Sequence, residues 1–178
     1  MNAFFPNIFT PGTIGILNLH NRLIMSLYPT KYAVDGQVTD RLIEFFRARA
    51  RGGVGLIVLD GFCLDYPNTY KGSAELRADG DEHVQGLRDL IGAINSEGVR
   101  AFTQLNYPAD VPVEPETPGA KEKQGRWTLP LVDAADDELI HHVIDCFGRG
   151  AAKAREIGYD GVEVQAGWGR WSPNSFRL

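Results

Sequence analysis

The sequence alternates short apolar runs with longer stretches of helical periodicity, and this alternation constrains its fold more than any other feature. Four runs of β-branched and aliphatic residues lie at residues 23–26, 55–59, 101–105 and 161–165. Each run is almost entirely apolar, as expected for strands that are covered on both faces. Strands that alternate with helices pair in parallel through βα units. The sequence therefore predicts an α/β fold with four parallel strands.

Three amphipathic helices are predicted between these strands. The first begins after Thr39, a good N-cap residue, the second covers about residues 81–97, and the third begins near residue 136. Glycines are expected to end them, namely Gly52 and Gly53, Gly98, and Gly158. The apolar stripes predict the buried positions, which are Leu42, Phe45, Phe46 and Ala50, then Val84, Leu87, Leu90, Ile91 and Ile94, then Ile140, Val143, Ile144, Phe147, Ala151 and Ala154.

Length and proline distribution predict one domain with one unusual loop. A chain of 178 residues suffices for a single compact core, so residues 1–178 are taken as one domain. Residues 107–130 hold five of the ten prolines. A loop of this length after a strand is more often a lid or a binding loop than a linker between domains.

Charge and cysteine content exclude several classes of function. The net charge of −5 comes without a basic block, which argues against a nucleic-acid partner or a membrane surface and favours a small molecule or a protein. No run approaches the roughly 20 apolar residues of a membrane helix, and the start does not resemble a secretion signal. Cys63 and Cys146 lie far apart without metal-type spacing, so we expect no disulfide framework, no metal site, and a cytoplasmic location.

Six segments together resemble a known family. They are residues 21–25 (NRLIM), 38–42 (VTDRL), 49–57 (RARGGVGLI), 81–83 (DEH), 104–106 (QLN) and 158–163 (GYDGVE). Their order and spacing are similar to the N-terminal half of the old yellow enzyme, or NADH:flavin oxidoreductase, family. The resemblance extends over nearly the whole chain. It implies a (β/α)8 TIM barrel that holds FMN at the C-terminal ends of its strands.

The resemblance implies that the chain supplies half of such a barrel, with four strands and three main helices. In the family the FMN phosphate is bound by the last βα unit, so binding of FMN by the isolated chain is expected to be weak or absent. Losing about three charge-assisted hydrogen bonds costs roughly 4 to 9 kcal/mol. Open strand edges would also leave backbone groups unpaired. We therefore expect a homodimer, or a complementary chain that carries the second half.

The family's catalytic motif is replaced after the fourth strand. The family reads Glu-x-His-x-x-His-Gly-Tyr, where the histidines bind the activating oxygen of the substrate and the tyrosine donates a proton. Here residues 163–170 read EVQAGWGR. Gln165 and Trp168 take the two oxygen-binding positions, and Arg170 takes the position of the tyrosine. Ene-reductase activity of this chain alone is therefore not expected.

Two further positions concern the flavin itself. Gln104 matches the glutamine that hydrogen-bonds the pyrimidine edge of FMN, and Ser26 lies in the turn beneath the ring, where the family's Met-Ala-Pro-Met becomes residues 25–28 (MSLY). Asp60 falls near the isoalloxazine, where it would place a negative charge beside a ring that must accept hydride.

Other residues at the predicted mouth allow two interpretations. Asp60 is either an acid or base in an apolar pocket or a capping or salt-bridging carboxylate, and Arg170 either binds an anionic group or forms a surface ion pair. Tyr28, Tyr107, Trp168 and Trp171 either form an aromatic rim for a flat ligand, or cover the open end or bury a dimer contact.

Two functions follow from these observations. The first is an FMN-dependent oxidoreductase subunit that is completed by a partner. The second is a repurposed half-barrel that binds a small hydrophobic or aromatic molecule, as a pseudoenzyme or as a cofactor-free isomerase or cyclase. A half-barrel without activity of its own would carry the same sequence.

Overall fold

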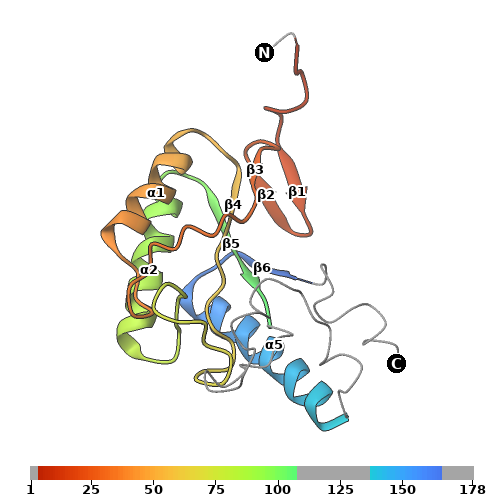
Figure 1. Cartoon of the computed structure of the whole chain (residues 1–178). Coiled ribbons are helices and arrows are strands. Elements are labelled where there is room, and N and C mark those ends of the chain that lie inside the picture. The colour runs from red at the N-terminus through yellow and green to blue at the C-terminus, as the bar shows by residue number, and fades with distance from the viewer. Residues whose placement is uncertain (1–3, 108–136, 166–178) are drawn as a thin grey trace, which may run out of the picture.

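The computed structural model describes residues 4–107 and 137–165, and its centre is a parallel four-stranded sheet (Figure 1). The strand order is β3-β4-β5-β6. The strands and the helices between them are β3 (Ile24–Met25), α1 (Asp40–Arg51), β4 (Leu56–Leu59), α2 (Asp81–Asn95), β5 (Arg100–Leu105), α5 (Asp137–Ile157) and β6 (Gly161–Val164). The predicted α/β fold with four parallel strands and three helices is confirmed.

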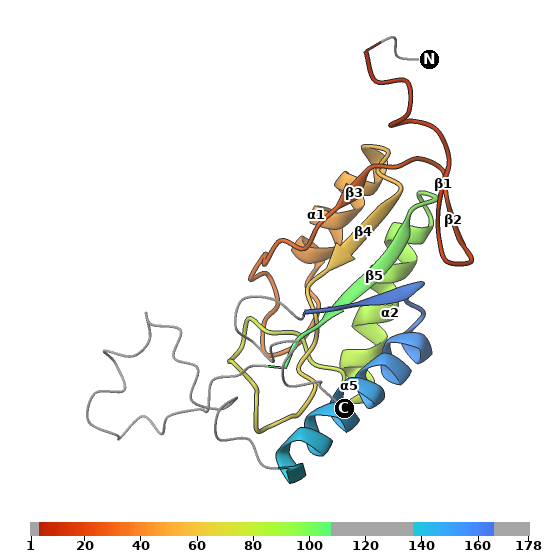
Figure 2. The same cartoon turned by 90° about the vertical axis from the view of Figure 1, so that its right-hand side faces the viewer.

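The three helices pack on one face of the sheet (Figure 2). Alternate residues of β5 show this sidedness, because Ala101, Thr103 and Leu105 are buried while Phe102 and Gln104 are only partly buried. Side chains of a strand alternate between its faces. Phe102 and Gln104 therefore lie on the face that has no helices, which corresponds to the inner face of a barrel.

The helix boundaries lie near the predicted capping residues, although α2 ends at Asn95, two residues before the predicted Glu97. The Thr39 hydroxyl accepts a hydrogen bond from the amide of Leu42 at 3.2 Å and so begins α1. Gly98 and Gly158 have φ values of 75° and 113°, which residues with a Cβ rarely adopt. In the part of the chain that the structure describes, no helix is long and apolar enough to cross a membrane.

The buried faces of α2 and α5 differ in how well they were predicted. All five apolar positions predicted for α2 are buried. On α5, the prediction of a buried Ile144 is wrong, because this side chain is 45% exposed. The buried positions of this helix are Val143, Cys146, Gly150, Ala154 and Ile157.

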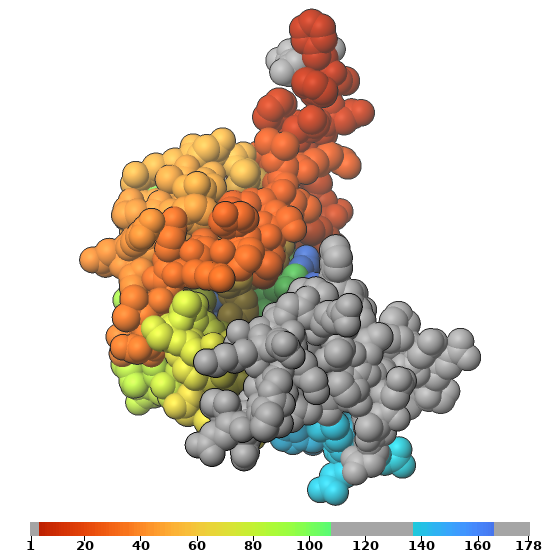
Figure 3. Space-filling view, in the orientation of Figure 1, coloured from red at the N-terminus to blue at the C-terminus, as the bar shows by residue number. Residues whose placement is uncertain are grey.

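An antiparallel hairpin, which was not predicted, precedes the sheet. It joins β1 (Gly12–Ile14) to β2 (Leu17–Leu19). Both views place it near the N-terminal ends of the parallel strands, opposite the end at which their arrowheads point (Figures 1 and 2). The chain that precedes the hairpin extends away from the rest of the described residues (Figure 3). Ile16, in the turn of the hairpin, is fully exposed.

Two polar side chains, of buried Asn21 and partly buried Asp160, connect the N-terminal ends of the strands to neighbouring segments. Asn21 is only 5% exposed; its Nδ2 donates to the carbonyl of Gly53 at 2.6 Å, and its Oδ1 accepts from the amide of Leu23 at 3.0 Å. Asp160 makes an equivalent connection, since its Oδ2 accepts from the amide of Ala101 at 2.9 Å. Each side chain thereby ties the entry of one strand to a neighbouring segment.

Replacing Asn21 by alanine is expected to lower the free energy of unfolding by about 1 to 3 kcal/mol, because the variant loses two hydrogen bonds of about 0.5 to 1.5 kcal/mol each. Equilibrium unfolding in urea measures this change. Asn18→Ala, at an exposed position of β2, is the matched control and should unfold close to wild type. An unchanged urea midpoint of unfolding for Asn21→Ala would show that the two hydrogen bonds of Asn21 do not stabilise the fold.

Candidate functional site

A cavity of about 940 Å³ opens where all four parallel strands end. Parallel strands present their carboxyl ends at one edge of a sheet, which is where α/β barrels place their active sites. Residues that follow each strand line the cavity: Leu27 after β3, Asp60 and Gly61 after β4, Gln104 and Asn106 at the end of β5, and Gln165 after β6. The cavity is therefore the candidate site.

Asp60 ties two walls of this cavity together. Its Oδ2 accepts a hydrogen bond from the amide of Thr30 at 3.1 Å, and its carbonyl accepts one from the hydroxyl of Thr103 at 3.4 Å. Burial raises the pKa of Asp60, while the Thr30 amide and the charge of Lys71 act in the opposite direction. Asp60 thus anchors a loop and carries a raised pKa, while its predicted role as an acid or base stays a prediction.

Gln104 lies on the open face of the sheet, beside Glu163 of β6. The two residues are register partners, and the Gln104 Nε2 donates to the Glu163 Oε1 at 2.5 Å. A primary amide has two N–H donors and one carbonyl acceptor. Among the described residues, no hydrogen bond occupies the second N–H or the side-chain carbonyl oxygen of Gln104.

A glycine after β4 permits the close approach that positions Gln104. A Cβ added at Gly61 would lie 2.0 Å from the carbonyl oxygen of Gln104. Real Cβ atoms do not come this near to backbone, so any other residue would push β5 away. Gly61 therefore sets how closely the ends of β4 and β5 meet at the cavity.

Three of the predicted site residues meet at this cavity, and among the other described ones Ser26, Tyr28 and Tyr107 do not line it. Asp60, Gln104 and Gln165 are in the lining. Ser26 is exposed, and Tyr28 is 60% exposed with its ring stacked against Phe45 at a centroid distance of 6.4 Å. Trp168, Arg170 and Trp171 lie outside the described residues, as does most of the segment 107–130.

Tyr107 does not point into the cavity but packs near α5. It is 8% exposed and belongs to a small cluster with Val143 and Cys146. Its hydroxyl donates to the Asp65 Oδ2 at 3.0 Å, and burial together with this carboxylate raises its pKa. The aromatic rim predicted from Tyr28 and Tyr107 is therefore not assembled among the described residues.

The loop between β4 and α2 adds charged residues that the sequence did not reveal. Lys71 and Glu75 both line the cavity, and the Glu75 Oε2 accepts from the amide of Lys71 at 2.6 Å. Lys31 lines it from the segment after β3. No periodicity or motif marks these positions, because they come from irregular backbone.

Comparison with known proteins identifies the family. Residues 7–170 match the NADH:flavin oxidoreductase / NADH oxidase family. The chain belongs to this family. It is 36% identical over 171 residues to a metal reductase of Desulforamulus reducens and 34% identical over 175 residues to an NADH oxidase of Thermoanaerobacter brockii. The resemblance inferred from the six segments is thereby confirmed.

This family member spans only part of the length of its relatives. The matches cover 91% and 93% of the chain but 25% of the metal reductase and 26% of the NADH oxidase. An NADPH dehydrogenase of Bacillus cytotoxicus, 27% identical, is covered to 47%. The old yellow enzyme from Trypanosoma cruzi superposes with a TM-score of 0.67 at 22% identity, covering 91% of this chain and 51% of that one. The described fold therefore matches part of a TIM barrel.

Replacing Asp60 by asparagine is expected to change the pH dependence of stability. Because burial raises the pKa of Asp60 in the folded state, the folded chain binds more protons than the unfolded chain above the ordinary aspartate value of 3.8. The wild type should therefore lose stability as pH rises from this value through the raised pKa. Asp60→Asn lacks this loss, so its stability relative to wild type should increase with pH over the same window.

Urea unfolding of both proteins at a series of pH values measures this difference. Asp89→Asn, at an exposed carboxyl on α2, is the matched control. A difference between Asp60→Asn and wild type that stays constant with pH would show that burial does not govern this carboxyl.

Proposed function

We propose that the cavity is one half of an FMN site in a flavin-linked oxidoreductase, and that four further βα units supply the other half. The observation that carries this proposal is the Gln104 amide, directed into a cavity at the strand ends of a family member. The cavity volume lies within the range of roughly 300 to 1,000 Å³ typical of small-molecule sites.

The lining fits the ring system of a flavin. Gln104 retains one N–H donor and one acceptor, which suits the alternating donors and acceptors at the edge of a pyrimidine ring. Leu27 and Pro29 add apolar surface in the same lining. When bound, FMN would supply hydride transfer, while Gln104 would hold and orient its polar edge.

The remaining lining residues define what this chain contributes to chemistry. Burial raises the pKa of Asp60, so its ionised form is less favoured here than at a solvent-exposed aspartate. Gln165 offers an uncharged amide where the family places an imidazole. We infer that this chain orients the cofactor but does not activate a substrate oxygen as the family's histidine pair does, so reductase activity needs the rest of a barrel.

The partner in this proposal completes the sheet. The described sheet ends at β3 and β6, and each edge strand carries an exposed apolar side chain: Ile24 is 50% exposed and Val164 is 53% exposed. Exposed strand edges with apolar side chains favour pairing with further strands. A second copy of this chain, or a segment that carries the other four βα units, would cover both edges.

Removing the Gln104 amide is expected to weaken FMN binding. We expect FMN to bind tightly when the chain is combined with the C-terminal barrel half of the Bacillus cytotoxicus NADPH dehydrogenase, and weakly to the chain alone. Gln104→Leu loses two hydrogen bonds of about 0.5 to 1.5 kcal/mol each, so its affinity should fall about 5- to 150-fold. Quenching of flavin fluorescence measures binding, and light scattering measures assembly.

The control for this experiment is Gln85→Leu, which changes an exposed glutamine on α2 and should bind FMN as wild type does. If FMN binds to neither the chain nor the assembled pair, or if Gln104→Leu binds equally well, the proposed cofactor site is wrong.

A second candidate function rests on Asp60. A carboxyl with a raised pKa in a partly apolar cavity is suited to acid–base chemistry without a cofactor. In this case the chain would act as a repurposed half-barrel on a small hydrophobic or aromatic molecule. Mass spectrometry of the purified protein distinguishes the two functions, because a bound apolar compound without flavin supports only the second.

A further inference from the structure

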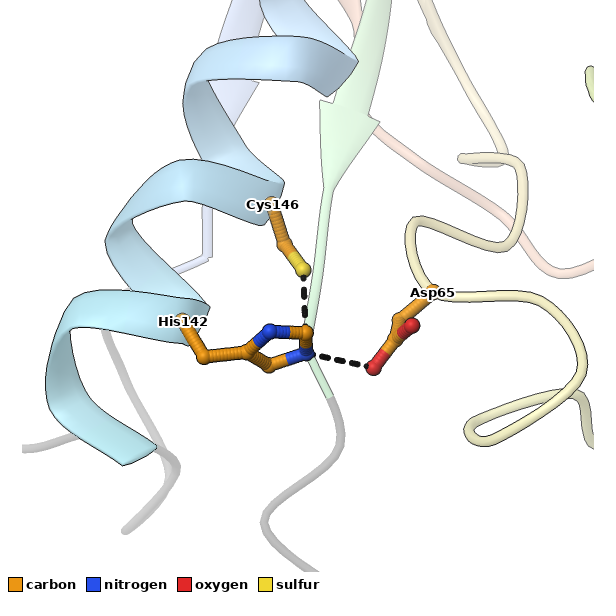
Figure 4. Close-up of side chains that lie close together, drawn as sticks. All are labelled: Asp65, His142 and Cys146. Atoms are coloured by element: carbon orange, nitrogen blue, oxygen red, sulfur yellow. Dashed lines mark hydrogen bonds and ion pairs between the residues drawn. The ribbon is translucent and has the colours of Figure 1, made fainter. Parts of the chain in front are cut away.

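Three side chains with metal-binding chemistry meet outside the cavity (Figure 4). His142 and Cys146 project from successive turns of α5, and Asp65 reaches them from the loop after β4. One ligand atom from each lies within 4.8 Å of the others. None of the three lines the cavity, so this cluster is separate from the proposed flavin site.

The contacts within this cluster do not form a nucleophilic triad. The Asp65 Oδ2 lies 2.8 Å from the His142 Nε2, and the Cys146 Sγ lies 3.5 Å from the same nitrogen. A triad requires the acid and the nucleophile on opposite nitrogens of the ring, so that the acid orients the base. Here both groups converge on one nitrogen, and burial raises the pKa of the Cys146 thiol.

The three ligand atoms are instead close enough to one another to surround a single metal ion. Zinc binds oxygen, nitrogen and sulfur at about 2.0 to 2.3 Å, which places tetrahedral ligand atoms about 3.3 to 3.7 Å apart. The contact of 3.5 Å between Sγ and Nε2 has this spacing, the Asp65 Oδ2 lies 2.8 Å from Nε2, and all three ligand atoms lie within 4.8 Å of one another. We propose that Asp65, His142 and Cys146 bind a divalent zinc-type cation with three protein ligands.

Neighbouring groups orient two of these ligands. Tyr107 donates to the Asp65 Oδ2 at 3.0 Å, and the Asn68 Nδ2 donates to the Asp65 Oδ1 at 3.1 Å. Arg149 donates to the Cys146 Sγ at 3.2 Å. Hydrogen bonds to coordinating carboxylates and thiolates hold the ligands in place and tune the metal. The Arg149 bond also offsets part of the charge of a bound thiolate.

The exposure of the cluster suits an open coordination position. The His142 side chain is 43% exposed, while Cys146 is fully buried. An ion can therefore enter from the side of the imidazole and keep a water molecule as its fourth ligand, as zinc sites with three protein ligands do.

Cobalt(II) titration of the whole chain tests the site, because cobalt reports its ligands through absorbance and takes zinc geometry. We expect a sulfur-to-cobalt charge-transfer band and the visible bands of tetrahedral cobalt, and zinc(II) should abolish both by displacement. Cys146→Ser should lose the charge-transfer band, and His142→Ala should weaken cobalt binding by at least about 100-fold. Tyr107→Phe, which removes an orienting bond, should weaken it by about 10-fold.

Matched controls are available in the same chain. Cys63→Ser removes the other cysteine and His141→Ala removes the adjacent histidine, and both should retain the cobalt spectrum. Because His142 is partly exposed, His142→Ala should keep its fold, and circular dichroism checks this. Absence of the charge-transfer band in wild type, its persistence in Cys146→Ser, or wild-type cobalt affinity in a folded His142→Ala would overturn the proposal.

Discussion

The close approach of β4 and β5 at their carboxyl ends is the constraint on which the candidate site depends. Gly61 lies against the carbonyl of Gln104 at a distance that no Cβ would allow. The pairing of β5 with β6 then brings Gln104 beside Glu163. Because parallel strands end at one edge, these two pairings place residues from distant parts of the sequence around a single cavity.

The sequence predicted the sheet and its helices well because their signals are local. Thr39 marks the start of α1 through its side-chain cap. Gly98 and Gly158 lie just after α2 and α5 with positive φ values that few other residues adopt. The hairpin was missed because its strands of three residues are too short to show alternation. Ile144 was misassigned because periodicity alone did not fix which edge of the apolar stripe on α5 meets the sheet.

The cavity was only partly predictable. Asp60, Gln104 and Gln165 directly follow or end strands, so their positions along the chain indicate a shared edge. Lys71 and Glu75 come from a loop whose path depends on tertiary contacts, such as the bridge between Phe62 and Leu76. The proposed metal cluster was not predicted from the sequence, which indicated no metal site. The spacing of four residues places His142 and Cys146 on one helix face. Asp65 comes near them only in the folded chain.

The two proposed sites lie on opposite sides of the end of β5, because successive side chains there point to opposite faces. Gln104 and Asn106 line the cavity, while Leu105 and Tyr107 are buried, with Tyr107 packed beside α5. The Leu105 side chain lies against Gly150, so the helix that carries His142 and Cys146 approaches this strand closely. Successive side chains of a strand point to opposite faces. Gln104 and Asn106 therefore face the cavity, while the Tyr107 hydroxyl faces the metal-ligand cluster and donates to Asp65. The sites therefore have separate linings but share the backbone that positions them.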